Sequence, residues 1–126
     1  MERVHFTGKV PYADYLRLLQ ISAAHVYLTY PFVLSWSMLE AMSAGALLIA
    51  SGTPPVREVV EHGRNGVLFD FFDKEALAAA VVDALARPHA YRAMRDAARR
   101  TIVERYDLAQ VCLPQWLRFV DRAGGA

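Results

Sequence analysis

The chain of 126 residues has few of the features that mark several large classes of protein. Its single cysteine, Cys112, excludes an intrachain disulfide and leaves no pair of thiols to bind a metal ion. The four histidines show no i, i+4 spacing and have no carboxylates at the spacing of metal ligands, which favours core or surface roles. We therefore expect no metal and no cofactor, and we assign the chain to a reducing compartment, the cytoplasm.

Long apolar runs and an excess of charge of one sign are also missing. No apolar run approaches the ~20 residues that span a membrane, and the first six residues lack the apolar core of a secretion signal. Fourteen basic and thirteen acidic side chains give a net charge of +1. This balance gives no indication of electrostatic capture of nucleic acid or of an anionic membrane, so any bound anion has to be held by local groups.

Apolar residues, by contrast, are plentiful, and their spacing predicts the fold. They make up 55% of the chain and give a mean hydropathy of +0.17, enough for the core of one domain. Short apolar runs predict strands at 4–6, 25–29, 46–50 and 67–69. Helical periodicity and helix-end signals predict helices at 12–19, 35–44, 53–60, 74–87, 89–105 and 107–122. This alternation implies right-handed crossovers and an α/β fold, a Rossmann-like parallel sheet with helices on both faces.

Two details extend this prediction. Four strands are few for a sheet of this class, so we expect strands that would precede Met1 to be missing. An unpaired sheet edge and uncovered apolar helix faces then favour self-association. In the last helix, Asp107 is a plausible N-cap, and Pro114 predicts a bend near Gln110.

The segment from 30 to 45 is the most informative about function. It reads as a strand end, a loop and a helix start, and the helix carries Glu40 among apolar neighbours. The apolar run at 46–50 is typical of a strand covered on both faces, which places Glu40 on a crossover helix near the sheet edge where ligands bind. A carboxylate there can accept two hydrogen bonds from a ribose. By residue type alone, a helix cap or a pair with an arginine is slightly favoured.

The start of the same helix offers unpaired amides and a partial positive charge, which suit a phosphate. Ser35 and Ser37 can cap this helix and can also reach a diphosphate, and the residues support the two interpretations about equally. Trp36 can stack on a sugar, although a tryptophan beside an apolar helix more often anchors packing. A basic strip at 92–99 is better explained as an exposed face than as a phosphate site, because acidic residues are interleaved with its arginines.

The run Met38-Leu39-Glu40-Ala41-Met42-Ser43-Ala44-Gly45, followed by 47–51, resembles the signature of family 4 (group 1) glycosyltransferases, which are retaining enzymes of the GT-B fold. Further motifs match in order and spacing at 4–10, 24–28, 55–60 and 63–68. In that family the C-terminal domain binds the nucleotide-sugar donor and a separate N-terminal domain binds the acceptor. The resemblance therefore implies that 1–106 is part of the donor-binding domain of an N-terminally truncated chain. Residues 107–126 would form a kinked helix that returns toward the missing N-terminal domain.

The resemblance also implies roles for particular residues. Glu40 corresponds to the second of two family glutamates and would hold the donor ribose. The loop at 34–37 matches the segment whose backbone amides face the diphosphate and the sugar, and Gly8 and Val10 match the loop that approaches the base. The implied substrate-binding residues are thus Gly8, Val10, Leu34, Ser35, Trp36, Ser37, Leu39 and Glu40. Glu58 resembles a family position that we interpret as structural support.

The sequence departs from the family pattern at three places. The first family glutamate is replaced by Phe32, and Val33 and Ser35 stand where the loop usually has glycines. The upstream arginine and lysine that neutralise the donor phosphates in this metal-independent family are not in the chain. We therefore assign no catalytic residue and expect the isolated chain to transfer no sugar. The alternative is a non-catalytic, degenerate glycosyltransferase-like binding or scaffold domain, and a flavodoxin-like or receiver-type domain is less well supported.

Overall fold

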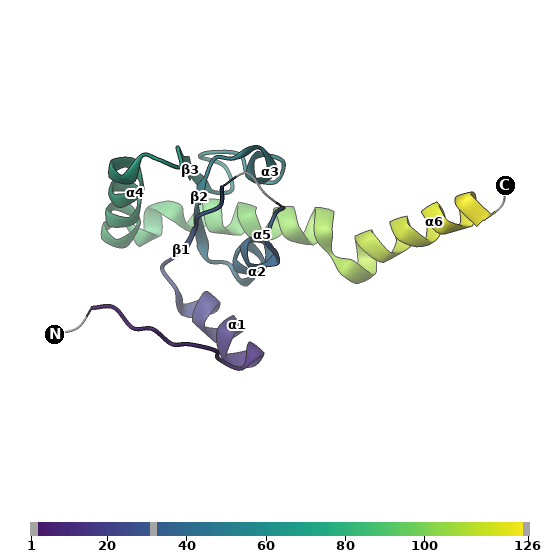
Figure 1. Ribbon diagram of the computed structural model, residues 1–126, viewed down its shortest axis with the longest axis horizontal. Helices are drawn as coiled ribbons and strands as arrows, with labels where there is room; N and C mark the ends of the chain where they lie inside the picture. Colours follow the sequence, from purple (N-terminus) through teal and green to yellow (C-terminus); the bar gives the residue numbers. More distant parts are fainter. Residues whose placement is uncertain (1–2, 31–32, 125–126) are drawn as a thin grey trace.

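The computed structural model describes residues 3–30 and 33–124, in which a parallel sheet lies between helices (Figure 1). The strands of these residues are β1 (Ala24–Tyr27), β2 (Leu47–Ser51) and β3 (Val67–Phe69), hydrogen-bonded in the order β1-β2-β3. The helices are α1 (Tyr12–Ile21), α2 (Trp36–Ala44), α3 (Pro54–Arg57), α4 (Lys74–Ala86), α5 (Arg92–Tyr106) and α6 (Leu113–Gly124). A 3₁₀-helix, η1 (Pro88–Tyr91), precedes α5, and a π-helix, η2 (Leu108–Cys112), precedes α6.

The central strand β2 explains the uniformly apolar run in the sequence, because all five of its residues are buried. Leu48 and Ala50 belong to a core formed with α2, the segment from α3 to Val60, and α5. Leu47 and Ile49 face the other way, into a core with Phe69 of β3 and Ala84 of α4. Successive side chains of a strand alternate between its two faces. The sheet is therefore covered on both sides, as predicted, and the α/β fold is confirmed.

Both ends of α2 are closed by specific contacts. At its start, the side chain of Ser35 accepts a hydrogen bond from the Ser37 amide at 3.3 Å. At its end, Gly45 adopts a left-handed conformation with φ of 82°, which a residue without a side chain adopts without strain. Two arginines of α5 donate to the last carbonyls: Arg95 to the oxygen of Gly45 at 2.7 Å, and Arg99 to that of Ser43. These two side chains of the basic strip thus cap the negative end of α2.

The predicted strand at 4–6 is wrong. These residues have no regular secondary structure, and the side chain of Phe6 is 96% exposed. Figure 1 shows that the segment lies apart from the sheet. A short alternation of apolar residues forms a strand only where a neighbouring strand supplies hydrogen bonds and a core covers one face. Since neither is present at this segment, the described sheet has three strands instead of the predicted four.

The C-terminal segment bends where the sequence predicted it. Asp107 accepts a hydrogen bond from the Gln110 amide at 2.7 Å and so caps η2, after which α6 starts with Pro114 in its first turn. Figure 1 shows α6 projecting away from the rest of the chain beyond this bend. The helix predicted at 89–105 instead begins as the 3₁₀ turn η1, and the one predicted at 53–60 ends at Arg57. None of the helices that the structure describes is both long and apolar enough to cross a membrane.

Candidate functional site

Glu40 lies half-buried on α2, at the seam where α1 packs against this helix. Leu19 of α1 is buried together with two small residues, Ala41 of α2 and Ala46, which follows the end of that helix. This close packing brings two tyrosines of α1 over α2. The hydroxyl of Tyr12 donates to Oε1 of Glu40 at 2.9 Å, and that of Tyr15 donates to Oε2 at 3.1 Å.

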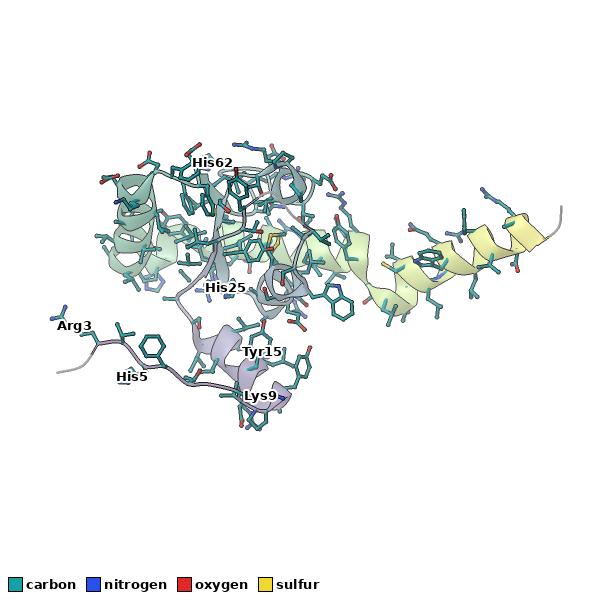
Figure 2. All side chains as sticks on the ribbon, in the orientation of Figure 1. Arg3, His5, Lys9, Tyr15, His25 and His62 are labelled. Carbon is teal, nitrogen blue, oxygen red and sulfur yellow. The ribbon has the colours of Figure 1, made fainter. Side chains whose placement is uncertain are left out.

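Within residues 3–30 and 33–124, the carboxylate is therefore held neither by its own helix nor by an arginine, the two structural roles considered from the sequence. Each of its oxygens accepts a hydrogen bond from a neutral donor of α1. The hydrogen bond to Glu40 raises the pKa of Tyr12, and burial together with the same carboxylate raises the pKa of Tyr15. Because both values lie above the ordinary one of about 10, both hydroxyls keep their protons at neutral pH. Figure 2 shows Tyr15 at this seam.

A hollow of about 290 Å³ follows the same seam. The residues that line this hollow include Tyr12, Glu40, Ser43 and Arg99. The Glu40 carboxylate thus borders open space and does not point into the packed interior. A negatively charged acceptor that is partly shielded from water and still accessible can bind a neutral hydroxyl ligand.

The amides at the start of α2 already have protein acceptors at three positions. The Ser35 amide donates to the hydroxyl of Tyr27 at 3.0 Å, the Ser37 amide to the hydroxyl of Ser35, and the Met38 amide to the Ser35 carbonyl at 3.3 Å. The hydroxyls of Ser35 and Ser37 lie 3.0 Å apart. Capping, one of the two interpretations of these serines, is therefore present. A role toward a diphosphate stays a prediction.

The other residues of the expected site fall into two groups. On and beside α2, the side chain of Trp36 is 81% exposed, whereas Leu34 and Leu39 pack against the core below the helix. Gly8, with φ of 61°, and the half-buried Val10 lie in the turn that leads into α1. Figure 2 places Lys9, between these two, at the N-terminal end of α1. Phe32 lies outside the described residues.

The model of the family "Glycosyl transferases group 1" matches residues 1–101, about four-fifths of the chain. The chain belongs to this family. The match spans α1 to α4 and most of α5, including Glu40, and it ends before η2 and α6.

A solved structure supports the fold of this group 1 glycosyltransferase chain. The crystal structure of Alr3699/HepE from Anabaena, determined in complex with UDP-glucose, superposes with a TM-score of 0.75 at 19% sequence identity. The similar region covers 83% of this chain but only 29% of HepE, so the chain spans less than a third of that protein's length. The likeness identifies the Rossmann-like architecture of a GT-B glycosyltransferase domain. Comparison with the curated proteins finds no match.

Sequence reasoning missed Tyr12 and Tyr15, which it counted as part of the apolar stripe of a helix. Their partner is 28 and 25 residues further along the chain, so no local spacing links them to it. Ser51 was missed as well. Its hydroxyl is buried, accepts from the Thr29 amide at 3.0 Å and donates to the Thr29 carbonyl at 2.9 Å, tying the end of β1 to the end of β2.

A larger hollow of about 520 Å³ lies elsewhere, between the segment after α3 and the C-terminal half of α5. Its polar groups largely satisfy one another. Asn65, which is buried, accepts from the Glu61 amide and donates to the Val59 carbonyl and to the hydroxyl of Thr101. Arg64 pairs with Glu61 at 2.8 Å. Glu58 is exposed here, and its backbone carbonyl accepts from Arg105 at 3.5 Å. The structural role expected for its side chain stays a prediction.

Proposed function

We propose that this chain is the donor-binding portion of a retaining, metal-independent family 4 glycosyltransferase. The enzyme would transfer a sugar from a nucleoside diphosphate to an acceptor held by an N-terminal domain outside this chain. One observation carries the proposal: in a chain that belongs to the group 1 family, Glu40 lines an accessible hollow. By its resemblance, this residue corresponds to the family glutamate that holds the donor ribose. The similarity of the fold to HepE, which was crystallised with UDP-glucose, adds support.

In this proposal the ribose hydroxyls donate to the two oxygens of Glu40. The diphosphate lies against the positive end of α2, where the hydroxyls of Ser35 and Ser37 bind it. The base approaches the turn at Gly8 and Val10, and Trp36 is exposed next to the expected sugar. Charge that develops on the leaving diphosphate is then stabilised by the positive end of α2 and by basic residues of the complete enzyme.

The proposal also gives a role to α6, which packs mainly against η2 and projects from the rest of the chain (Figure 1). The helix presents an apolar face that is about half exposed or more: Leu113, Trp116, Leu117, Phe119 and Val120. Exposed apolar faces of this size mark interaction sites. The similar region covers only 29% of HepE, so most of that protein's length has no counterpart in this chain. We propose that α6 returns to the N-terminal acceptor domain and buries its apolar face against that domain.

We further expect the isolated chain to transfer no sugar and to act in the cytoplasm. The family's phosphate-neutralising arginine and lysine have no counterpart in its sequence, and Phe32 cannot accept a hydrogen bond from a sugar. Turnover of any nucleotide sugar by the purified 126-residue chain would contradict the first expectation. The second candidate function is a binding or scaffold domain without catalysis, favoured by the same Phe32 and by the missing arginine and lysine.

Calorimetry with uridine and guanosine diphosphates tests the donor-binding role. Glu40→Gln keeps the shape and removes the charge, so it should weaken binding about tenfold, the difference between a charged and a neutral acceptor. Glu58→Gln makes the same change at an exposed position on another helix end and should leave binding unchanged. Equal affinity of the wild-type chain and the Glu40→Gln variant would refute the assignment of Glu40 to the ribose.

A further inference from the structure

Two tyrosine hydroxyls converge on one carboxylate at the seam of α1 and α2. We infer that Tyr12 and Tyr15 are positioning residues, which hold the Glu40 carboxylate in the orientation that recognises the ribose. This inference rests on the proposed function. It adds that the selectivity of the site for ribose over deoxyribose depends on α1, a helix that does not itself have to touch the nucleotide.

The chemistry of the three groups favours this role over simple stabilisation. A carboxylate has about four lone-pair sites, and the tyrosines use one on each oxygen, at 2.9 and 3.1 Å. As far as the described part of the chain is concerned, one site on each oxygen stays open for a ribose hydroxyl. An arginine fork would instead take both oxygens and neutralise the charge. The observed arrangement fixes the carboxylate and leaves its charge and half of its accepting capacity to a ligand.

The placement of the tyrosines supports the same conclusion. The side chain of Tyr12 is 62% exposed, so its hydroxyl does not need Glu40 to satisfy its hydrogen bonding in water. Its ring lies 6.0 Å from that of Tyr15, and the pair forms one wall of the seam. The packing between α1 and α2 comes from Leu19, further along α1, with Ala41 and Ala46, and from Tyr15, which also packs against this cluster. A phenylalanine keeps the ring at position 15. The hydroxyls can therefore be removed without losing the contact that joins the two helices.

Binding of ribo- and deoxyribonucleotides by the whole chain tests the inference. We would measure the dissociation constants of UDP and 2′-deoxy-UDP for the wild type and for Tyr12→Phe, Tyr15→Phe and the double variant. In the wild type, the 2′-hydroxyl should improve affinity about tenfold, as expected for one hydrogen bond to a charged acceptor. In the double variant, the ratio of the two dissociation constants should fall to about threefold or less. The Glu40 carboxylate is then unrestrained, and the conformational freedom that it loses on binding the 2′-hydroxyl offsets part of the gain in affinity.

The matched control is Tyr91→Phe, which removes a tyrosine hydroxyl from another carboxylate, Asp83 of α4. This variant should keep the wild-type selectivity. A merely structural role of Tyr12 and Tyr15 would weaken both nucleotides equally and leave the ratio unchanged, and this result would overturn the inference alone. Tighter binding by the double variant would overturn it too, because the tyrosines would then compete with the ribose. A wild-type chain that binds both nucleotides equally, or neither, would overturn the proposed function and the inference together.

Discussion

The hydroxyl of Ser51 joins the carboxyl ends of β1 and β2 beside the loop that leads into α2. It is fully buried, and it both accepts from the amide and donates to the carbonyl of Thr29. Ser51→Ala deletes both hydrogen bonds and leaves two partly buried backbone groups without this partner. At 0.5–1.5 kcal/mol for each bond, we expect a loss of about 2 kcal/mol in the free energy of unfolding, or roughly 8 °C in Tm for a chain of this size.

Urea unfolding followed by circular dichroism measures this loss. Ser22→Ala is the matched control, because the Ser22 hydroxyl donates to the Leu18 carbonyl at 2.6 Å on an exposed helix end. Water replaces that partner, so the control should lose less than about 0.5 kcal/mol. If the two variants lose the same free energy of unfolding, the reasoning is refuted, because the burial of the Thr29 backbone groups would then not affect stability.

Three further results are expected. Thr53→Val should change stability by less than about 0.5 kcal/mol in urea unfolding, because the buried Thr53 hydroxyl has no hydrogen-bond partner among the described residues; a loss above about 1.5 kcal/mol would contradict this. Burial lowers the pKa of His25, so the unfolded chain takes up a proton at a higher pH than the folded chain, and the free energy of unfolding should fall as the pH drops below about 6.5. His25→Gln should make this fall shallower, and an unchanged dependence of stability on pH would contradict the prediction. Along the described edge strand β1, Val26 is 41% exposed, so we expect concentration-dependent self-association in light scattering and its reduction by Val26→Lys; a monomer at high concentration would exclude this edge as an interface.

The sequence predicts best the features that depend on local composition. The run at 46–50 predicts a strand buried on both faces, and Gly45 predicts the end of α2, and the structure has both. Burial on both faces requires apolar residues and a left-handed turn favours glycine, so both features can be predicted from residue type. The strand at 4–6 fails because pairing is not local. An alternation of three residues is compatible with a strand, but it carries no information about whether a partner strand is present.

The candidate site shows the same division. The position of Glu40 on a crossover helix follows from the pattern around it, and so does the cap at Ser35. The donors that actually reach these groups come from far along the chain. Tyr12 and Tyr15 precede Glu40 by more than twenty residues, and Arg95 reaches the Gly45 carbonyl across 50 residues. Such contacts depend on how the helices pack, which residue spacing within one helix does not encode.

A crystal structure of the chain bound to UDP tests the central claim most directly. We predict that the ribose hydroxyls lie within hydrogen-bonding distance of both Glu40 oxygens, with the diphosphate at Ser35 to Ser37. UDP bound instead in the larger hollow beside Arg64 and Arg105, with the Glu40 carboxylate free of nucleotide, would contradict it.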